Sequence, residues 1–444
     1  MRNKENSDHT LSCSDILFTP ILDTQYPIPS YLYSVDLKEK IILLSAKYFP
    51  EVVSIRRHLH AHPELSFEEY NTSKFISGKL KEWGIPYKDV IVKTGIVALI
   101  EGKKPLPSPL GEGPGVRSIA LRADIDALPI EEKNKVEYRS KKPGVMHACG
   151  HDVHTSSMLG VAKILNELKN EFSGTVKLIF QPGEEKAPGG ASLMIREGVL
   201  EDPKPTSIFA QHVYPSLEAG KVGFRSGKYM ASTDEIYLTV KGKGGHAAMK
   251  GTYISPLLIA SEILLALEKT FSVSPSGGGK GEELPTVLAF GRMHANGATN
   301  VIPDEVTIDG TFRTMDEPWR KEAHQIIRKI CIDVAKTSGG NCEVNIVTGY
   351  PALVNDEVTT SRARRSAEEF LGKENVIELE LRMTGEDFSF FAEKIPSCFY
   401  RLGTGNISKG ITSGVHTPTF DVDESSLKTG MGLMAWIALN ELKK

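Results

Sequence analysis

Three imidazoles, one thiol and one carboxylate lie within nine residues in the stretch Met146-His147-Ala148-Cys149-Gly150-His151-Asp152-Val153-His154. A neutral imidazole with a neighbouring thiolate suits zinc or a similar divalent ion. Apolar side chains at helical spacing follow from Met158 to Leu168, so we expect this stretch on a loop that leads into a helix over residues 155–168. The dipole at the start of such a helix favours the thiolate form of Cys149.

A different interpretation of the same stretch is a group of buried, hydrogen-bonded histidines with an inert cysteine. The density of the cluster favours the metal interpretation. None of the other four cysteines has a cysteine close to it in the sequence, whereas a structural zinc site takes closely spaced ligands. Further ligands must therefore come from distant parts of the chain.

Composition limits the classes of protein to which the chain can belong. Its 444 residues exceed what one hydrophobic core usually supports, so two domains are expected. A formal net charge of −3 gives no electrostatic footprint for nucleic acid or for an anionic membrane. Residues 1–35 contain no apolar signal core or membrane span and are expected to form a loose extension. Five cysteines, few and odd in number, suit a reducing compartment, so a cytoplasmic location is expected.

Three apolar segments are predicted to be strands, and polar side chains follow each of them. Because ligand sites of open α/β sheets lie at the carboxyl ends of the strands, these side chains are expected to converge with the Cys/His stretch. The segments are 118–123, followed by Asp124 and Asp126; 175–180, followed by Glu184 and Glu185; and 207–211, followed by His212.

Shorter signals complete the first part of the chain. Helical spacing predicts a helix over residues 37–59, and Ser66 with Glu69 predicts a capping box for a second helix that ends near 84. Residues 90–100 are predicted to be one strand, and the Pro- and Gly-rich segment 103–115 an exposed insertion after it. His58, His60 and His62 precede a proline turn without an acidic partner in register, which favours a structural role.

From residue 232 the pattern changes to strand-helix-strand-strand-helix-strand over residues 235–347, the ferredoxin-like order. We therefore predict an α/β protein whose catalytic domain, residues 36–230 and 350–444, is interrupted by an inserted α+β domain at 231–349, here called the lid. A Gly- and Ser-rich loop at 274–283 is expected within the lid.

The candidate metal ligands number five, which is more than one tetrahedral ion needs and suits two ions that share a bridge. Glu184 stands beside one of these ligands but is free, as a general base would be. The alternative for two adjacent glutamates is a solvated surface. The five candidates are Cys149, His151, Glu185, His212 and His416.

Five motifs resemble those of the co-catalytic metallopeptidases that include aminoacylase and carboxypeptidase G2. Within that family the chain is most similar to the amidohydrolase branch, which contains hippuricases, auxin-amino acid conjugate hydrolases and bacterial N-acyl-L-amino acid amidohydrolases. The motifs follow one another in order within residues 37–442, which argues against coincidence. They are Arg122-Ala123-Asp124-Ile125-Asp126-Ala127-Leu128-Pro129, His147-Ala148-Cys149-Gly150-His151-Asp152, Gln181-Pro182-Gly183-Glu184-Glu185, Gly244-Gly245-His246-Ala247-Ala248 and Asn300-Val301-Ile302-Pro303.

The resemblance implies a phosphorylase/hydrolase-like catalytic domain with a mixed sheet, a dimerising lid, and hydrolysis of the amide bond of N-acyl amino acids. It makes the five candidates ligands of two divalent ions, manganese, zinc or cobalt, and Glu184 the general base. In this chain Asp124-Ile125-Asp126 stands where much of the wider family has His-x-Asp, and Cys149 replaces a bridging Asp.

The resemblance also implies a homodimer in which His246 completes the active site of the other subunit, with Asn300 as a second donor. Arg313 is a candidate for holding the substrate carboxylate, because guanidinium binds carboxylate bidentately, although an ordinary surface arginine fits equally well. A catalytically silent metal-binding scaffold is the alternative function. A deaminase is a weaker one, because the Pro-Cys-x-x-Cys half of that zinc signature is absent.

Overall fold

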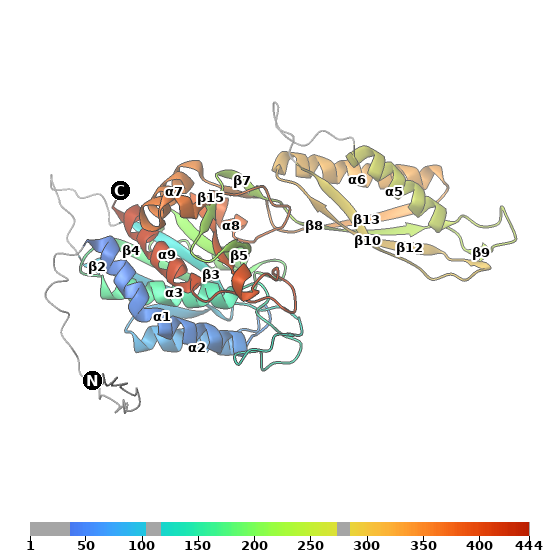
Figure 1. The fold of residues 1–444 in the computed structure, drawn as a ribbon. Helices are drawn as coiled ribbons and strands as arrows, with labels where there is room; N and C mark the ends of the chain where they lie inside the picture. Colours follow the sequence, from blue (N-terminus) through green and yellow to red (C-terminus); the bar gives the residue numbers. More distant parts are fainter. Residues whose placement is uncertain (1–35, 104–116, 273–284, 444) are drawn as a thin grey trace, which may run out of the picture.

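The computed structural model describes residues 36–103, 117–272 and 285–443. The predicted extension at 1–35, the insertion at 103–115 apart from its first residue, and the Gly- and Ser-rich loop at 274–283 lie outside the described residues. Within them the chain forms two parts, one around an eight-stranded sheet and one around a four-stranded sheet (Figure 1).

The larger sheet is mixed, and its strand order is β1-β2-β4-β3-β5-β16-β6-β15. Its centre, β4-β3-β5-β16, is parallel, whereas β1, β2 and β6 run antiparallel to a neighbour. The strands are β1 (Tyr87–Ile91), β2 (Gly95–Lys103), β3 (Ser118–Asp124), β4 (Ser173–Gln181), β5 (Ile208–Glu218), β6 (Val222–Phe224), β15 (Val376–Glu378) and β16 (Ser397–Gly405).

Helices cover both faces of this sheet, which is why every residue of β3 and β16 is buried. Alternate residues of β3 enter different cores: Leu121 packs with α1, α3 and α9, and Ala120 packs with α4 and α8. The helices are α1 (Leu37–Ala61), α2 (Tyr70–Glu82), α3 (His151–Glu167), α4 (Gly190–Arg196), α7 (Glu357–Leu371), α8 (Ser389–Ala392) and α9 (Ser426–Leu442).

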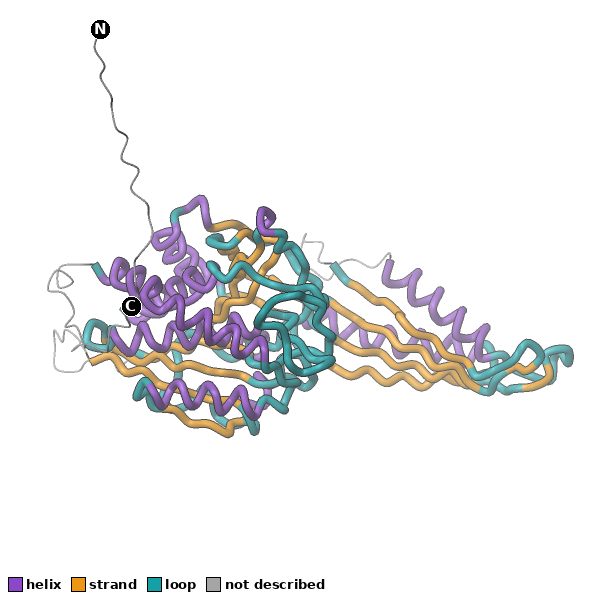
Figure 2. Tube along the Cα trace, turned by 60° about the horizontal axis from the view of Figure 1, so that its bottom comes forward, coloured by secondary structure: helices purple, strands orange, loops and turns teal. Residues whose placement is uncertain are grey.

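The four-stranded sheet of the lid is antiparallel, with the order β10-β12-β8-β13, and α5 and α6 pack on it. Figure 2 shows its helices and strands as separate layers. This arrangement confirms the predicted ferredoxin-like fold, while the boundaries at 231 and 349 stay a prediction. Its elements are β8 (Asp234–Lys241), α5 (Pro256–Ser272), β10 (Val287–Ala295), β12 (Glu305–Arg313), α6 (Glu317–Thr337) and β13 (Asn341–Thr348).

Two short pairs of strands lie outside these sheets. β9 (Gly245–His246) pairs with β11 (Val301–Ile302), and Figure 1 places β9 at the end of the lid that points away from the larger sheet. β7 (Gly227–Met230) pairs with β14 (Leu353–Asn355) on either side of the lid in sequence.

Three local predictions were wrong. The strand expected over residues 90–100 is two strands, because the chain reverses between Ile91 and Gly95. The capping box is not formed, since the Ser66 hydroxyl donates to Asp126 Oδ2 at 2.6 Å and α2 begins only at Tyr70. His212 does not follow its strand but lies inside β5, which continues to Glu218.

Candidate active site

The predicted ligands converge at the carboxyl ends of β3 and β4. Cys149 directly precedes the residue that caps α3, and His151 is the first residue of that helix, so the helix starts earlier than predicted. Glu185 lies in the loop after β4, and His212 projects from β5. His416 comes from the loop between β16 and α9, where its φ is 61°.

The ligand atoms of the five residues form two overlapping groups within metal-binding reach. Cys149, His151 and His212 form one group, and Cys149, Glu185 and His416 form the other. The Cys149 Sγ atom lies 3.4 Å from His212 Nε2 and 3.3 Å from His416 Nε2. His416 Nε2 lies 3.2 Å from Glu185 Oε1. Because Cys149 belongs to both groups, its sulfur is placed where a bridge between two ions would be.

Two of these atoms are buried without a hydrogen-bond partner. His151 Nε2 and Glu185 Oε1 lie 3.9 Å apart, and neither forms a hydrogen bond within the part of the chain that the structure describes, although His416 Nε2 lies within ion-pair distance of Glu185 Oε1. Unpaired buried polar atoms cost free energy, and a cation between them would remove that cost. The sulfur, nitrogen and oxygen donors present therefore fit a pair of borderline divalent ions.

Acidic and main-chain groups form hydrogen bonds that orient these donors. Asp126 Oδ1 lies 3.1 Å from His151 Nδ1, and the Glu185 amide donates to Asp126 Oδ2 at 3.0 Å. His212 Nδ1 donates to the Val213 carbonyl at 2.9 Å, which leaves its Nε2 as an acceptor. Such partners fix the ring orientation of ligating histidines.

Protons compete with a metal for this site. Although burial opposes protonation, the carboxylates of Asp124 and Asp126 raise the pKa of His151 to about 10. Burial and the carboxylates of Glu185 and Glu184 raise the pKa of the Cys149 thiol well above its usual value. The expected thiolate stabilised by the helix dipole is thus a wrong prediction, because burial and then the nearby carboxylates raise the thiol pKa.

Glu184 is 7% exposed, and among the described residues none hydrogen-bonds its carboxylate. Burial and the nearby carboxylates of Glu386 and Glu185 raise its pKa well above the usual value. The Tyr350 hydroxyl donates to the Glu184 carbonyl at 2.6 Å, which holds the main chain of this residue. A buried carboxylate with raised pKa next to metal donors has the properties of a general base.

Sequence reasoning did not assign roles to the buried ionic network behind Glu184. Arg122 lies 2.6 Å from Asp124, 3.1 Å from Glu386 and 2.8 Å from Asp387. Asp387 stands 265 residues after Arg122, so no local pattern connects them. The only sequence signal was the position of Arg122 and Asp124 on one apolar strand, where a charge needs a partner.

A cavity of about 750 Å³ opens in front of these donors. It contains Arg313, whose NH1 donates to the Met383 carbonyl at 3.3 Å. His246 and Asn300 do not line it: they are exposed and lie together at the antiparallel strand pair β9–β11, where the Ala247 amide donates to the Asn300 carbonyl at 3.1 Å. The chain thus brings together all predicted site residues except the lid pair. Of the predicted catalytic and metal-binding side chains, those that line the cavity are Cys149, Glu184, Glu185, His212 and His416.

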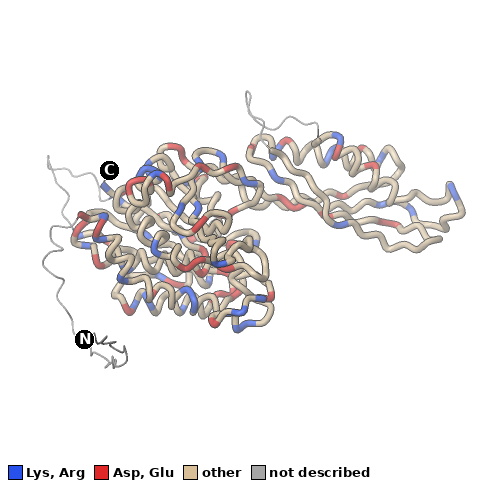
Figure 3. Tube along the Cα trace, in the orientation of Figure 1, with Lys and Arg blue, Asp and Glu red and all other residues tan. Residues whose placement is uncertain are grey.

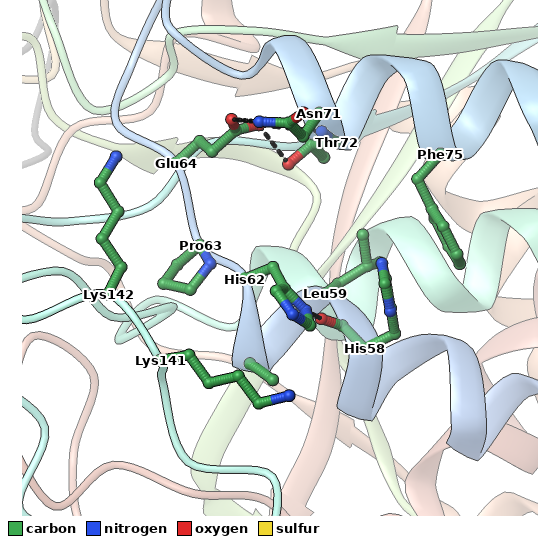
Figure 4. A pocket seen from close by; sticks show the side chains of 11 residues that line it. His58, Leu59, His62, Pro63, Glu64, Asn71, Thr72, Phe75, Lys141 and Lys142 are labelled. Carbon is green, nitrogen blue, oxygen red and sulfur yellow. Dashed lines mark hydrogen bonds between the residues drawn. The ribbon is translucent and has the colours of Figure 1, made fainter.

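A second cavity, of about 500 Å³, lies between the end of α1 and the start of α2 (Figure 4). Its Glu64 carboxylate already accepts hydrogen bonds from Asn71 and Thr72, and His58 stacks on Phe75 at 4.2 Å. These side chains are engaged with one another, as expected for structural residues.

Acidic and basic residues alternate along both parts of the chain (Figure 3). Among the helices of the described ranges, none combines the length and apolar character needed to cross a membrane. The four described cysteines, Cys149, Cys331, Cys342 and Cys398, are buried and not disulfide-bonded.

Comparison with known proteins gives the family. Residues 120–440 match peptidase family M20/M25/M40. The chain is 37% identical over 413 residues to IAA-amino acid hydrolase ILR1-like 4 of Arabidopsis thaliana, which covers 92% of this chain and 90% of that relative. It is 38% identical over 379 residues to N-acetyl-L-cysteine deacetylase of Bacillus subtilis, 85% of either chain.

The fold is shared with solved members of the same family. The YXEP protein of Bacillus subtilis, described as a dinuclear metal binding peptidase, is similar with a TM-score of 0.75 and 34% identity, over 90% of this chain and 99% of that one. The predicted architecture, a catalytic α/β domain with an inserted lid, is confirmed by this similarity. Together these matches, which cover most of the chain, show that it is an amide-bond hydrolase of peptidase family M20/M25/M40.

Proposed function

We propose that the protein is a metal-dependent amidohydrolase that cleaves N-acyl-L-amino acids to a carboxylic acid and a free amino acid. The observation that carries this proposal is Glu184, a buried and unpaired carboxylate beside two groups of metal donors. The names of the relatives, an IAA-amino acid hydrolase and an N-acetylcysteine deacetylase, support the substrate class.

The two donor groups would hold two divalent ions, and manganese, zinc and cobalt all suit a mixed sulfur, nitrogen and oxygen set. When bound, such ions polarise the amide carbonyl and make water a stronger nucleophile at neutral pH. Cys149, His151, Glu185, His212 and His416 are the ligands that we assign.

Glu184 moves the protons in this proposal. Its carboxylate accepts a proton from the attacking water and passes that proton to the amide nitrogen, which leaves as the amine. A raised pKa suits both steps, since a general base works best when its pKa is near the operating pH. The Tyr350 hydrogen bond to the Glu184 carbonyl keeps the base in place during the transfer.

Substrate recognition is assigned to the lid. Arg313 lines the cavity and has no acidic partner among the described residues, so it is free to bind the α-carboxylate of the amino acid. His246 and Asn300 are assigned to the active site of a second subunit in a homodimer, where His246 donates a hydrogen bond to the oxyanion. A cytoplasmic location stays a prediction.

A catalytically silent metal-binding scaffold is the second candidate. A silent scaffold does not explain Glu184, a buried carboxylate that lines the cavity, lacks a hydrogen-bond partner and has a raised pKa. Such a group costs stability, so it needs a functional reason. The enzyme therefore explains more of the structure.

The experiment is a pair of isosteric substitutions at adjacent residues. Glu184→Gln should retain the metal and lose turnover of N-acyl amino acids by about 10²- to 10⁴-fold, as expected for a general base. Glu185→Gln should lose metal, because it removes the charge that faces His416 and His151. Elemental analysis and turnover are measured for both proteins. Equal metal loss in the two variants would contradict the division of roles.

A further inference from the structure

Three arginine side chains line the same cavity as the candidate metal donors. Arg313 and Arg382 are half-buried and Arg401 is 4% exposed, and all three line the cavity. We call them the arginine cluster. They come from the lid strand β12, the segment before α8 and strand β16, so they meet only in the folded protein.

Each of the three arginines forms a hydrogen bond close to the isolated β-bridge between Met230 and Arg382. Arg382 donates its amide to the Tyr229 carbonyl at 3.0 Å, and Met230 forms a bridge with it. Arg401 donates to Met230 Sδ at 3.2 Å, while Arg313 donates to the carbonyl of Met383, the neighbour of Arg382. Three positively charged side chains therefore line the same cavity.

None of the three guanidinium groups forms an ion pair with a described residue. The partners of Arg401 are the Tyr229 hydroxyl at 2.8 Å, the Met230 sulfur and the ring of Phe399 at 5.1 Å. Arg382 lies over the ring of Tyr214 at 5.0 Å, and its Nε is buried without a hydrogen-bond partner. These hydrogen-bond and ring partners are neutral, although the Glu386 carboxylate interacts electrostatically with Arg401. By contrast Arg56, Arg122 and Arg320, the other buried arginines, form direct ion pairs with carboxylates.

Buried charge without a counter-charge is costly, and like charges near one another add to that cost. A guanidinium group binds carboxylate bidentately and with good geometry, so a ligand with carboxylates would relieve it. One α-carboxylate, assigned above to Arg313, leaves Arg382 and Arg401 without an ion-pair partner among the described residues. The cluster is thus larger than a substrate with a single carboxylate needs.

We propose that the substrate carries a second carboxylate, which Arg382 and Arg401 bind. The enzyme therefore prefers N-acyl derivatives of acidic amino acids, or N-acyl amino acids whose acyl group carries a carboxylate. This inference rests on the proposed function. The second carboxylate comes either from the amino-acid side chain or from the acyl group, and the chemistry of recognition is the same in both cases.

Two matched pairs of substrates test the proposal and separate these sources. N-acetyl-L-glutamate is compared with N-acetyl-L-glutamine, and N-succinyl-L-alanine with its terminal amide. Within each pair the size is the same and only the charge differs. In at least one pair the acid should have a kcat/KM about 10- to 100-fold higher, as expected for a charge-assisted bidentate contact. Equal rates in both pairs, or faster hydrolysis of the amides, would overturn the proposal.

Substitutions in the arginine cluster test which residues cause the preference for the acid over the amide. Arg382→Met should bring the ratio between acid and amide close to one, and Arg382→Lys should keep part of it, since it keeps the charge but not the fork. Arg196→Met, an exposed arginine on α4 outside the cavity, is the control and should leave the ratio unchanged. An unchanged ratio in Arg382→Met would refute the assignment. Thermal unfolding of each variant shows that it is folded.

Binding to the Glu184→Gln protein distinguishes this proposal from the proposed function. If no N-acyl amino acid is hydrolysed, the proposed function fails, and calorimetry with N-acetyl-L-glutamate and N-acetyl-L-glutamine still measures the preference for charge. About 10-fold or tighter binding of the acid supports the arginine cluster as a dicarboxylate site. Equal dissociation constants for acid and amide would contradict it even if neutral N-acyl amino acids are hydrolysed.

Discussion

His246→Ala is expected to lower turnover even though His246 is far from the cavity in its own chain. The Ala248 amide donates to His246 Nδ1 at 3.2 Å, so the neutral ring carries its proton on Nε2. His246 is exposed and belongs to β9, which pairs with β11 at the outer end of the lid (Figure 1), so a second subunit can reach it. Removing one well-placed oxyanion donor costs about 10²- to 10³-fold in kcat.

Subunit complementation measures whether this donor acts across a dimer. A Glu184→Gln chain and a His246→Ala chain, each nearly inactive, are mixed in equal amounts and allowed to exchange. In a mixed dimer one site carries both defects and the other carries neither, so that dimer has about half of the wild-type activity. Random exchange makes about half of all dimers mixed, so the whole sample should recover about a quarter.

The control is His294→Ala, which removes an exposed histidine from lid strand β10 and should leave turnover unchanged. Native mass spectrometry verifies that mixed dimers have formed. If activity does not return although mixed dimers are present, His246 does not act in trans. Full loss of dimers in His246→Ala would instead mean that the residue supports assembly.

Two further predictions follow from the site. A chelator should abolish turnover, and manganese, zinc or cobalt should restore it. The chelator should also remove metal more readily as the pH falls. His151, whose pKa is raised to about 10, and the Cys149 thiol must lose protons to bind metal, so metal affinity rises with pH. Metal content after dialysis at several pH values measures this, and a flat profile would contradict it. Tyr350→Phe should lower kcat about 5- to 10-fold with little change in KM, because it removes one hydrogen bond to the Glu184 carbonyl and none to substrate. A change in KM alone would refute that reasoning.

The order of elements could be read from the sequence because it depends on local patterns. Alternating and continuous apolar runs predicted β3, β4 and β5, and the change of pattern near residue 232 predicted the lid. The convergence of Asp124, Glu185 and His212 followed from the parallel order β4-β3-β5. The family motifs then selected which polar side chains to group.

What the sequence could not give depends on contacts between distant segments. Ser66 looks like a helix cap in sequence, but its hydroxyl binds Asp126, which is 60 positions away and orients His151. The arginine cluster joins two strands and the segment before α8, and of its members only Arg313 was singled out from the sequence. The pKa of Cys149 likewise depends on its burial in the folded protein and on carboxylates from another loop.

The structure also explains how an inserted lid can influence the catalytic base. The chain enters and leaves the lid side by side: the Thr233 amide donates to the Tyr350 carbonyl at 3.0 Å, and the Tyr350 amide donates to the Thr233 hydroxyl at 3.0 Å. Asp234, the first residue of β8, accepts two hydrogen bonds from Arg320 of α6, at 2.9 and 2.5 Å. Breaking a buried pair of this kind costs about 3–5 kcal/mol, so the two connections move with the lid as one unit. The Tyr350 side chain reaches from this unit to the Glu184 carbonyl at 2.6 Å, so one hydrogen bond connects the base of the lid with the main chain of Glu184.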